Sequence, residues 1–297
     1  MSTPSAPAPI IVTDGTCDLP QALVDQYAIH VVPLRILFGS ESYLSGVEMD
    51  VNQFAERLAV GDVHPTSSQP TMHDFQEVYT QLGAEGTPIL SIHLSERLSG
   101  TVNAARQAAE KLPDLAITVW DSLTISAALG LQVLTAARAA AQGYSTEQII
   151  PLVEQTYANG NLLFSLDDLS FLLRGGRIGS VRYHVAQTLN IRPVITVSKS
   201  GSETGTYISA GRARSLEKAL DVFVKHIAAD VGEGAKLRAM TFHGVDPTPD
   251  LADILNHKLQ QMFDCVFLEK APSTPVLGVH VGPKAIDIGY AAGDWPV

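Results

Sequence analysis

The sequence predicts an α/β fold made of two α/β domains. Short β-branched runs alternate with longer helical ones, which is the pattern of a parallel sheet covered by helices. Polar residues stand directly after several strands, at the edge where open α/β sheets place their ligands. The pattern changes after residue 160. We therefore expect an N-terminal domain with a mostly parallel, Rossmann-like sheet, a mixed α/β C-terminal domain, and a ligand between them.

The N-terminal domain is expected over residues 10–160. Asp18 can cap the helix that follows the first strand. Thr71 and Asp74 resemble a capping box that opens a later helix, and the loop before it spans residues 61–70. The apolar and β-branched runs predict strands over 10–12, 30–38, 88–94 and 117–120, and the helical segments between them are expected over 50–60, 101–111, 125–142 and 146–158.

The C-terminal domain is expected over residues 161–292. Two runs at 191–198 and 204–209 flank a Lys-Ser-Gly-Ser segment and predict a hairpin. Near the end, alternating runs at 276–281 and 285–290 surround a Gly-Pro turn, and both are expected as strands. The remaining strands are expected over 162–165, 237–242 and 265–268, and the helices over 166–173, 214–229 and 249–262.

Composition excludes several classes of protein. The chain has 297 residues, of which 45% are hydrophobic and 17% charged, and this is the composition of a globular protein. Its net charge of −11 disfavours nucleic acid as a partner. Cys17 and Cys265 stand alone, which suits a reducing compartment, and residues 1–9 lack the features of a signal peptide. With no apolar run long enough for a membrane span, we expect a cytoplasmic protein.

The common motifs of cofactor and metal sites are missing from the sequence. There is no Gly-Lys dipeptide for a P-loop, no GxGxxG after a strand and no HExxH among the nine histidines. A GxSxG nucleophile elbow is also missing, which weakens the case for an α/β-hydrolase. We therefore expect neither a cofactor nor a metal ion.

Two hydroxyl-rich segments stand where a helix is expected to begin. Ser67 lies in Thr-Ser-Ser-Gln-Pro, and Ser99 and Gly100 lie in Leu-Ser-Gly-Thr. Helix N-termini with free N–H groups bind anions, and hydroxyls add neutral donors. The alternative is that both serines only cap helices, although two such junctions in one domain should share one edge of the sheet.

Three further segments carry residues that suit an anion or an acid. Arg177 follows paired glycines, and its guanidinium suits a carboxylate or a phosphate unless the glycines only end a helix. His280 precedes a Gly-Pro turn, where a buried histidine bonded to the backbone is the alternative interpretation. Asp14 and Asp18 can act as acids or can pin their loop through Asx-turns.

Taken together and in order, these segments resemble the landmarks of the DegV family and extend over residues 10–292 as one DegV-type unit. The matching segments are Ile-Val-Thr-Asp14 with Asp18-Leu-Pro, Thr66-Ser-Ser-Gln-Pro, Leu98-Ser-Gly-Thr, Asp121-Ser, Gly175-Gly-Arg-Ile, Ile191-Arg-Pro and His280-Val-Gly-Pro.

The resemblance implies a carboxylate site. Ser67 and Ser99 match the family's two carboxylate contacts, with the Gly100 N–H beside them, and Arg177 and His280 are implied to assist the carboxylate or its phosphate. Ser67 stands where the family commonly has Thr and keeps the hydroxyl. Gly15 stands where the family usually has Ser, which puts in doubt any part of that loop in docking a kinase.

The function that the resemblance implies is that of a lipid-binding subunit without catalytic residues of its own. It would bind a long-chain fatty acid in an apolar tunnel, present the carboxylate to a separate ATP-dependent fatty acid kinase and hold the acyl phosphate for an acyltransferase. Each buried CH₂ contributes ~0.8 kcal/mol, and the buried carboxylate needs convergent donors. The alternatives are a serine-dependent lipid hydrolase or acyltransferase using Ser99 and His280, and a sensor or transport-linked protein for another amphipathic molecule.

Overall fold

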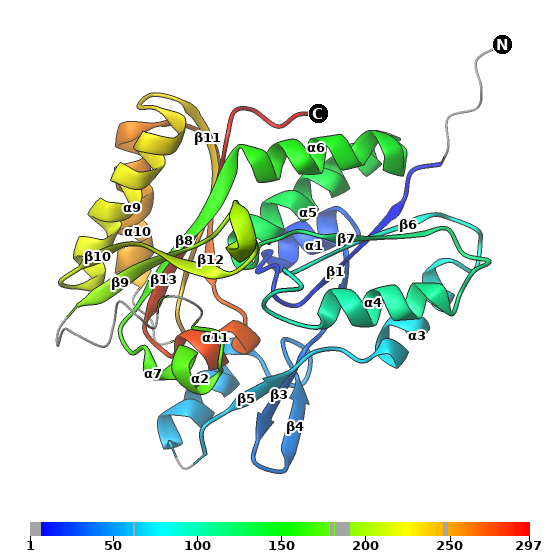
Figure 1. Ribbon diagram of the computed structural model, residues 1–297, viewed down its shortest axis with the longest axis horizontal. Helices are drawn as coiled ribbons and strands as arrows, with labels where there is room; N and C mark the ends of the chain where they lie inside the picture. The colour runs from blue at the N-terminus through cyan, green and yellow to red at the C-terminus, as the bar shows by residue number, and fades with distance from the viewer. Residues whose placement is uncertain (1–6, 62, 179–180, 182–190, 246–248) are drawn as a thin grey trace.

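The N-terminal half of the chain forms a parallel four-stranded sheet (Figure 1). The computed structural model describes residues 7–61, 63–178, 181, 191–245 and 249–297. Helices connect strands of this sheet, as parallel pairing requires. In order across the sheet, the strands are β2 (His30–Val32), β1 (Ile10–Asp14), β6 (Ile89–His93) and β7 (Ile117–Asp121).

The C-terminal half forms a mixed six-stranded sheet. The predicted hairpin is confirmed, because its two strands pair antiparallel at one edge. The sheet also contains one parallel pair at its other edge. In order, the strands are β10 (Tyr207–Ala213), β9 (Arg192–Val197), β8 (Gly160–Leu166), β13 (Ala285–Ala292), β11 (Lys236–His243) and β12 (Asp264–Pro272). A parallel sheet followed by a mixed one confirms the predicted fold class.

A third, antiparallel sheet corrects two predictions. Its strands are β4 (Glu41–Leu44), β3 (Arg35–Phe38) and β5 (Thr66–Ser68). The prediction of one strand over 30–38 is wrong. Pro33, which has no N–H for a ladder, lies between β2 and β3, and these two strands join different sheets. The predicted loop over 61–70 contains β5, whose pairing partner β3 is far away in sequence.

Helices cover both large sheets. α3 and α4 pack on the parallel sheet, α9 and α10 on the mixed one, and α6 packs on α5. The helices are α1 (Gln21–Gln26), α2 (Val51–Val60), α3 (Met72–Leu82), α4 (Thr101–Glu110), α5 (Ser126–Ala141), α6 (Thr146–Ala158), α7 (Ser170–Arg174), α9 (Leu216–Val231), α10 (Pro249–Met262) and α11 (Pro275–Val281).

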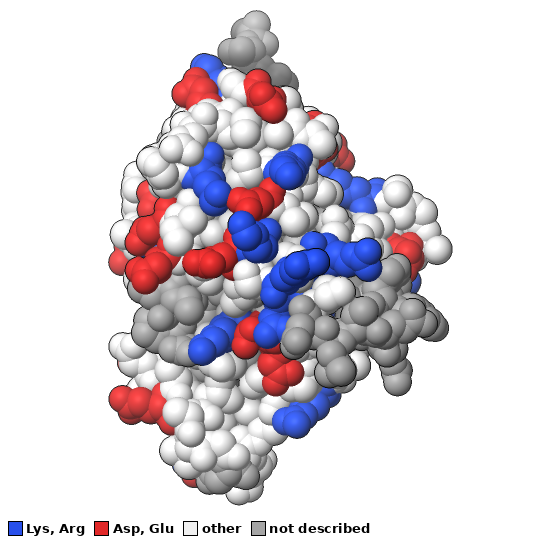
Figure 2. All heavy atoms as spheres, turned by 90° about the vertical axis from the view of Figure 1, so that its left-hand side faces the viewer, with Lys and Arg blue, Asp and Glu red and all other residues white. Residues whose placement is uncertain are grey.

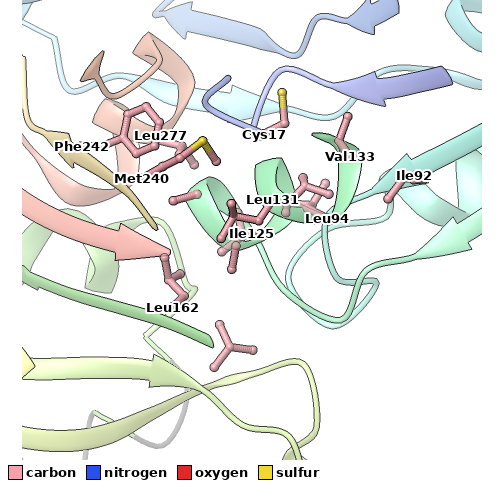
Figure 3. Close-up of a cluster of buried hydrophobic side chains, with 14 of the residues drawn as sticks. Cys17, Ile92, Leu94, Ile125, Leu131, Val133, Leu162, Met240, Phe242 and Leu277 are labelled. Carbon is pink, nitrogen blue, oxygen red and sulfur yellow. The ribbon is translucent and has the colours of Figure 1, made fainter. Parts of the chain in front are cut away.

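The helix α5 lies between the two large sheets. It contacts β1 and β6 on one side and β8, β11 and β13 on the other, so nearly all of its residues are buried and it is apolar on every face. Figure 3 shows side chains from both halves around it, among them Ile92, Leu162 and Phe242. The division near residue 160 falls between α6 and β8 and stays a prediction, since one core contains residues from both sides.

The structure corrects the prediction of a strand over 276–281. Those residues belong to the helix α11, which has Thr274 as N-cap and Pro275 in its first turn. Proline favours the first turn of a helix, and a short apolar run does not distinguish helix from strand by its period. The helix packs against β3 and β5, and this carries His280 from the C-terminal half to the small sheet.

The sequence predicts that Asp18 caps α1, and this prediction is wrong. The N-cap is Pro20, and no side chain caps it. The Asp18 carboxylate instead accepts hydrogen bonds from the Thr274 N–H at 2.8 Å and the Ser126 hydroxyl at 2.8 Å. These partners lie more than 100 residues away in the chain, and no local sequence pattern announces them. The capping box of Thr71 and Asp74, by contrast, is confirmed at the start of α3.

Charge is divided unevenly along the chain. Residues 1–160 hold 17 Asp or Glu and 6 Lys or Arg, whereas residues 161–297 hold 14 of each. Figure 2 shows Lys and Arg side chains gathered across the middle of one face, with Asp and Glu both among them and at the left edge. The entire negative excess therefore belongs to the N-terminal half. Among the described residues, no helix is both long and apolar enough to cross a membrane.

Candidate functional site

A cavity of about 570 Å³, part of which opens to solvent, lies where the N-terminal loops meet α11. The side chains of Ser67, Ser99, Arg177 and His280 all line it, so the structure brings together the four side chains that the sequence singles out. Gly100 lies next to Ser99 as the N-cap of α4 and is not among the residues that line the cavity.

Ser67 and His280 form the closest polar contact in this cavity. The Ser67 Oγ lies 2.7 Å from the His280 Nε2. Burial, together with the smaller effects of Arg177 and His64, lowers the pKa of His280 to about 4. The imidazole is therefore neutral at pH 7. Among the described residues, its Nδ1 has no hydrogen-bond partner.

That unpartnered nitrogen indicates which ring nitrogen carries the hydrogen. A buried N–H without an acceptor is rarer than a buried acceptor without a donor. The neutral ring therefore carries its hydrogen on Nε2 and donates it to the Ser67 Oγ. The Ser67 hydroxyl hydrogen is then free to point into the cavity. The pair thus offers one neutral hydrogen-bond donor to a ligand.

Paired glycines position both His280 and Arg177. A Cβ atom at Gly175 would lie 2.5 Å from the His280 Nδ1, so the ring occupies the space that any other residue would fill. The Gly175 carbonyl oxygen accepts a hydrogen bond of 2.6 Å from the Arg177 Nη1. The guanidinium is exposed and lies at the rim of the cavity. The Gly-Gly-Arg segment therefore places a cation beside a neutral donor.

Ser99 lies in the turn that leads into α4. Its Oγ is 2.9 Å from the Thr101 Oγ1 and accepts a longer hydrogen bond from the Thr101 N–H. A Cβ atom at Gly100 would lie 2.5 Å from the Gln69 Oε1, so the glycine leaves room for the Gln69 amide, which also lines the cavity. The sequence reasoning missed Gln69, although it stands inside the Thr66–Pro70 segment.

Thr16 is a second lining residue that the sequence reasoning missed. The Asp14 carboxylate holds it, because Oδ1 accepts hydrogen bonds from the Thr16 N–H at 3.0 Å and its hydroxyl at 2.6 Å. This confirms the Asx-turn interpretation of Asp14. The other oxygen, Oδ2, accepts from the Leu94 N–H at 3.0 Å and lies 3.0 Å from the His93 Nδ1. These buried hydrogen bonds therefore fix the position of Thr16 in the wall of the cavity.

A second cavity of about 370 Å³ adjoins the first and shares four of its lining residues. Its walls come from α11, the start of α5 and the mixed sheet, and they are mostly apolar, with Leu162 and Phe164 on the side of the sheet. The shared residues are Ile125, Tyr207, Leu277 and Val281. The polar site thus leads into an apolar interior.

A third hollow, of about 340 Å³, adjoins the site on its outer side and shares Ser67, Arg177 and His280 with it. Arg174 lines it, and the Arg174 Nη1 lies 3.2 Å from the His64 Nδ1. Burial and the Arg174 charge lower the pKa of His64. The guanidinium groups of Arg174 and Arg177 therefore make this outer hollow cationic. No group of three or more His, Cys, Asp or Glu is arranged to hold a metal ion within the described part of the chain.

Comparison with known proteins gives one consistent answer. The model of the family described as "Uncharacterised protein, DegV family" matches residues 10–293. A DegV domain-containing protein of Deinococcus radiodurans is 36% identical over 290 residues, which cover 98% of each chain.

Solved structures agree with that match. A DegV family protein from Thermus thermophilus, described as binding fatty acid, has a TM-score of 0.87 at 30% identity and covers 96% of this chain and 99% of its own. DegV of Bacillus subtilis, described as a fatty acid binding protein, has a TM-score of 0.86 at 26% identity and covers 97% of this chain and 100% of its own. The family model spans nearly the whole chain, and the chain belongs to the DegV family.

Proposed function

We propose that this protein binds a long-chain fatty acid, with the carboxylate at Ser67 and Ser99 and the acyl chain in the adjoining apolar cavity. The observation that carries the proposal is the contact between the two cavities, one of which contains the hydroxyls of Ser67 and Ser99 and the Arg177 guanidinium, while the other is lined mostly by aliphatic and aromatic side chains. The printed descriptions of the Thermus and Bacillus structures support it. Burial of each methylene contributes ~0.8 kcal/mol to binding.

The head group needs several donors, because a buried carboxylate without partners is very costly. The Ser67 hydroxyl is free to donate once His280 donates to its oxygen, and the Ser99 hydroxyl and the Gly100 N–H are the further neutral donors of this proposal. Arg177 at the rim supplies a positive charge. The neutral His280 orients the Ser67 hydroxyl and stays unprotonated across the physiological range.

The carboxylate lies close to the surface in this arrangement, where a separate kinase subunit can phosphorylate it. The outer hollow adds Arg174 to Arg177 beside the head group, and guanidinium groups suit phosphate oxygens. An acyl phosphate carries more negative charge than the free acid, so these cations favour the phosphorylated form. The protein then holds the acyl phosphate until an acyltransferase accepts it, and no catalytic residue of this chain is required.

Native mass spectrometry of freshly purified protein tests the binding step. We expect a non-covalent adduct with the mass of a long-chain fatty acid, which organic solvent extracts as the free acid. A double variant, Ser67→Ala with Ser99→Ala, should lose the adduct, whereas Ser68→Ala, an exposed neighbour on β5, should keep it. Protein that carries no lipid and binds none when supplied would refute the proposal.

The kinase step needs its own experiment. His280→Ala should retain the fatty acid, with weaker binding, and should reduce phosphate formation when a fatty acid kinase subunit and ATP are added. Loss of all fatty acid binding in this variant would contradict the orienting role. Equal phosphate formation in the variant and the wild type would contradict the part of His280 in presenting the head group.

One contact favours a second candidate function, a serine-dependent lipid hydrolase or acyltransferase. Ser67, and not Ser99, is the hydroxyl within hydrogen-bond distance of His280 among the described residues. Such a pair can activate a nucleophile only in the other tautomer, in which Nε2 accepts from the hydroxyl, and the unpartnered Nδ1 leaves the histidine without the third group that orients a triad. A fluorophosphonate that labels Ser67 covalently would favour the hydrolase, and an unlabelled protein favours the carrier.

A further inference from the structure

The apolar cavity contains one acidic side chain, Asp287. It lies on β13, a central strand of the mixed sheet. Its neighbours Ile286 and Ile288 point to the opposite face and pack in the core under α9 and α10, whereas Ala285 and Ala291 share the core around α5. On the cavity side the strand thus carries small apolar residues and a single carboxyl group. Phe164 stands opposite Asp287 on β8 and also lines the cavity.

The carboxyl group of Asp287 takes part in a short chain of hydrogen bonds. The Ser126 Oγ lies 2.5 Å from the Asp287 Oδ2 and 2.8 Å from the Asp18 Oδ2. The hydroxyl has one hydrogen, so two contacts of this length need a second proton on one carboxyl group. Burial and the Asp18 charge raise the pKa of Asp287 well above its ordinary value. Asp287 is therefore a neutral acid that donates to Ser126, which donates to Asp18.

The Ser126 hydroxyl does not need Asp287 as a hydrogen-bond partner. Asp18 alone accepts the serine hydrogen, and its other oxygen accepts from the Thr274 N–H. The Asp287 Oδ1 is shielded from solvent and has no hydrogen-bond partner among the described residues. Buried acceptors usually have partners. Since Asp18 alone satisfies Ser126, rotation about the broad terminal torsion of Asp287 lets its carboxyl group exchange the contact with Ser126 for one with a hydroxyl group in the cavity that the side chain lines.

We propose that the cavity selects an acyl chain that carries a hydroxyl group, and that Asp287 is the residue that recognises it. The hydroxyl donates to the unpartnered carboxyl oxygen of Asp287. An unsubstituted chain instead places methylenes against a polar group and leaves that oxygen unpaired. This inference rests on the proposed function, since it names the class of fatty acid for the same site. Ser273 is another polar residue that lines the cavity, and it provides the control.

Isothermal titration calorimetry on the full chain, freed of lipid, tests the proposal. The ligands are palmitic and stearic acids and a positional series of their monohydroxy derivatives. We expect one position of the hydroxyl group to bind about tenfold more tightly than the parent acid, the gain of one buried hydrogen bond. Asp287→Asn keeps an acceptor oxygen and should keep the preference. Asp287→Leu should reverse it in favour of the parent acid, and Ser273→Ala should leave it unchanged.

The outcomes separate this inference from the proposed function. Binding of the parent acids without preference for any hydroxylated one would overturn the inference and leave the proposed function intact. Failure of the wild-type chain to bind any of the acids would overturn both. A preference that Asp287→Leu keeps, or that Ser273→Ala abolishes, would show that Asp287 is not the recognition residue. If Asp287→Leu does not fold, the wild-type and Asp287→Asn titrations still decide the result.

Discussion

The substitution Gly175→Ala tests how the Gly-Gly-Arg segment positions the head-group site. The backbone of Gly175 has φ −68° and ψ −13°, which alanine adopts without strain. The added Cβ would lie 2.5 Å from the His280 Nδ1, whereas ordinary contacts begin near 3.4 Å. The ring must therefore move by about 0.9 Å, which disrupts the 2.7 Å contact between its Nε2 and the Ser67 Oγ.

The size of the effect follows from that displacement. One hydrogen bond contributes about 0.5–1.5 kcal/mol, so a fatty acid should bind up to about tenfold more weakly to the variant. Stability should fall by about 0–2.5 kcal/mol, because the cost of overpacking, about 1–3 kcal/mol, is partly offset by the lower entropy of the unfolded alanine chain, about 0.4–1 kcal/mol. Titration calorimetry measures the affinity, and urea unfolding measures the stability.

The adjacent Gly176 provides a matched control. Its φ is +71° and nothing lies within 4 Å of a Cβ atom there, so Gly176→Ala strains the backbone without touching His280. We expect this variant to lose about 1–2 kcal/mol of stability and to keep its affinity for the fatty acid. Unchanged affinity in Gly175→Ala, or an equal loss of affinity in both variants, would refute the role of Gly175 in seating the histidine.

Three further predictions concern stability. Arg35 donates two hydrogen bonds, of 2.8 and 2.9 Å, to Asp74 and holds the pKa of that carboxyl well below its ordinary value. The stability that this ion pair contributes to the fold is therefore present above about pH 4 and is lost on acidification. Arg35→Gln should therefore lower the free energy of unfolding at pH 7 more than at pH 2, and equal losses at both pH values would contradict this. Leu129→Ala removes a fully buried side chain from the shared helix α5 and should cost about 2–5 kcal/mol in urea unfolding, whereas a loss below about 1 kcal/mol would show that α5 is not a common core element. Burial raises the pKa of Asp18 to about 6 and also raises the pKa of Asp287, so folding takes up protons and the free energy of unfolding should fall as the pH rises from about 4 through 6 and beyond. Urea unfolding of Asp287→Asn should show a weaker fall with pH. A pH profile identical to that of the wild type would contradict the pairing of the two acids.

Local sequence patterns predict the elements that local interactions determine. The capping box of Thr71 and Asp74 and the Asx-turn at Asp14 depend on neighbours two or three residues away, and both are present. The alternation of strands and helices likewise predicts the parallel and mixed sheets, because each element carries its own apolar pattern.

Long-range contacts explain the errors. The helix α11 looks like a strand in sequence because a run of six residues, five of them apolar or small, does not fix a period, and its packing against β3 and β5 decides the outcome. Asp18 looks like a helix cap, but its partners Ser126 and Thr274 come from distant segments. Tertiary contacts override a local preference in both cases.

The candidate site likewise contains residues that sequence motifs mark and residues that only tertiary packing brings together. Ser67, Ser99, Arg177 and His280 were found through an ordered set of motifs, and they line one cavity. No comparable signal marks Thr16 or Tyr207, whose side chains join the site only through the packing of separate elements. The acyl cavity itself arises from the space between α5, α11 and the mixed sheet, which no linear pattern describes.

A crystal structure of the protein with a fatty acid that is brominated near the end of its chain tests the central claim most directly. Anomalous scattering locates the bromine atom without reference to the rest of the ligand. We predict that it lies in the inner cavity, between α5 and the Leu162 and Phe164 side chains, with the carboxylate beside Ser67 and Ser99. A bromine atom in the outer hollow next to Arg174, or outside both cavities, would contradict this account.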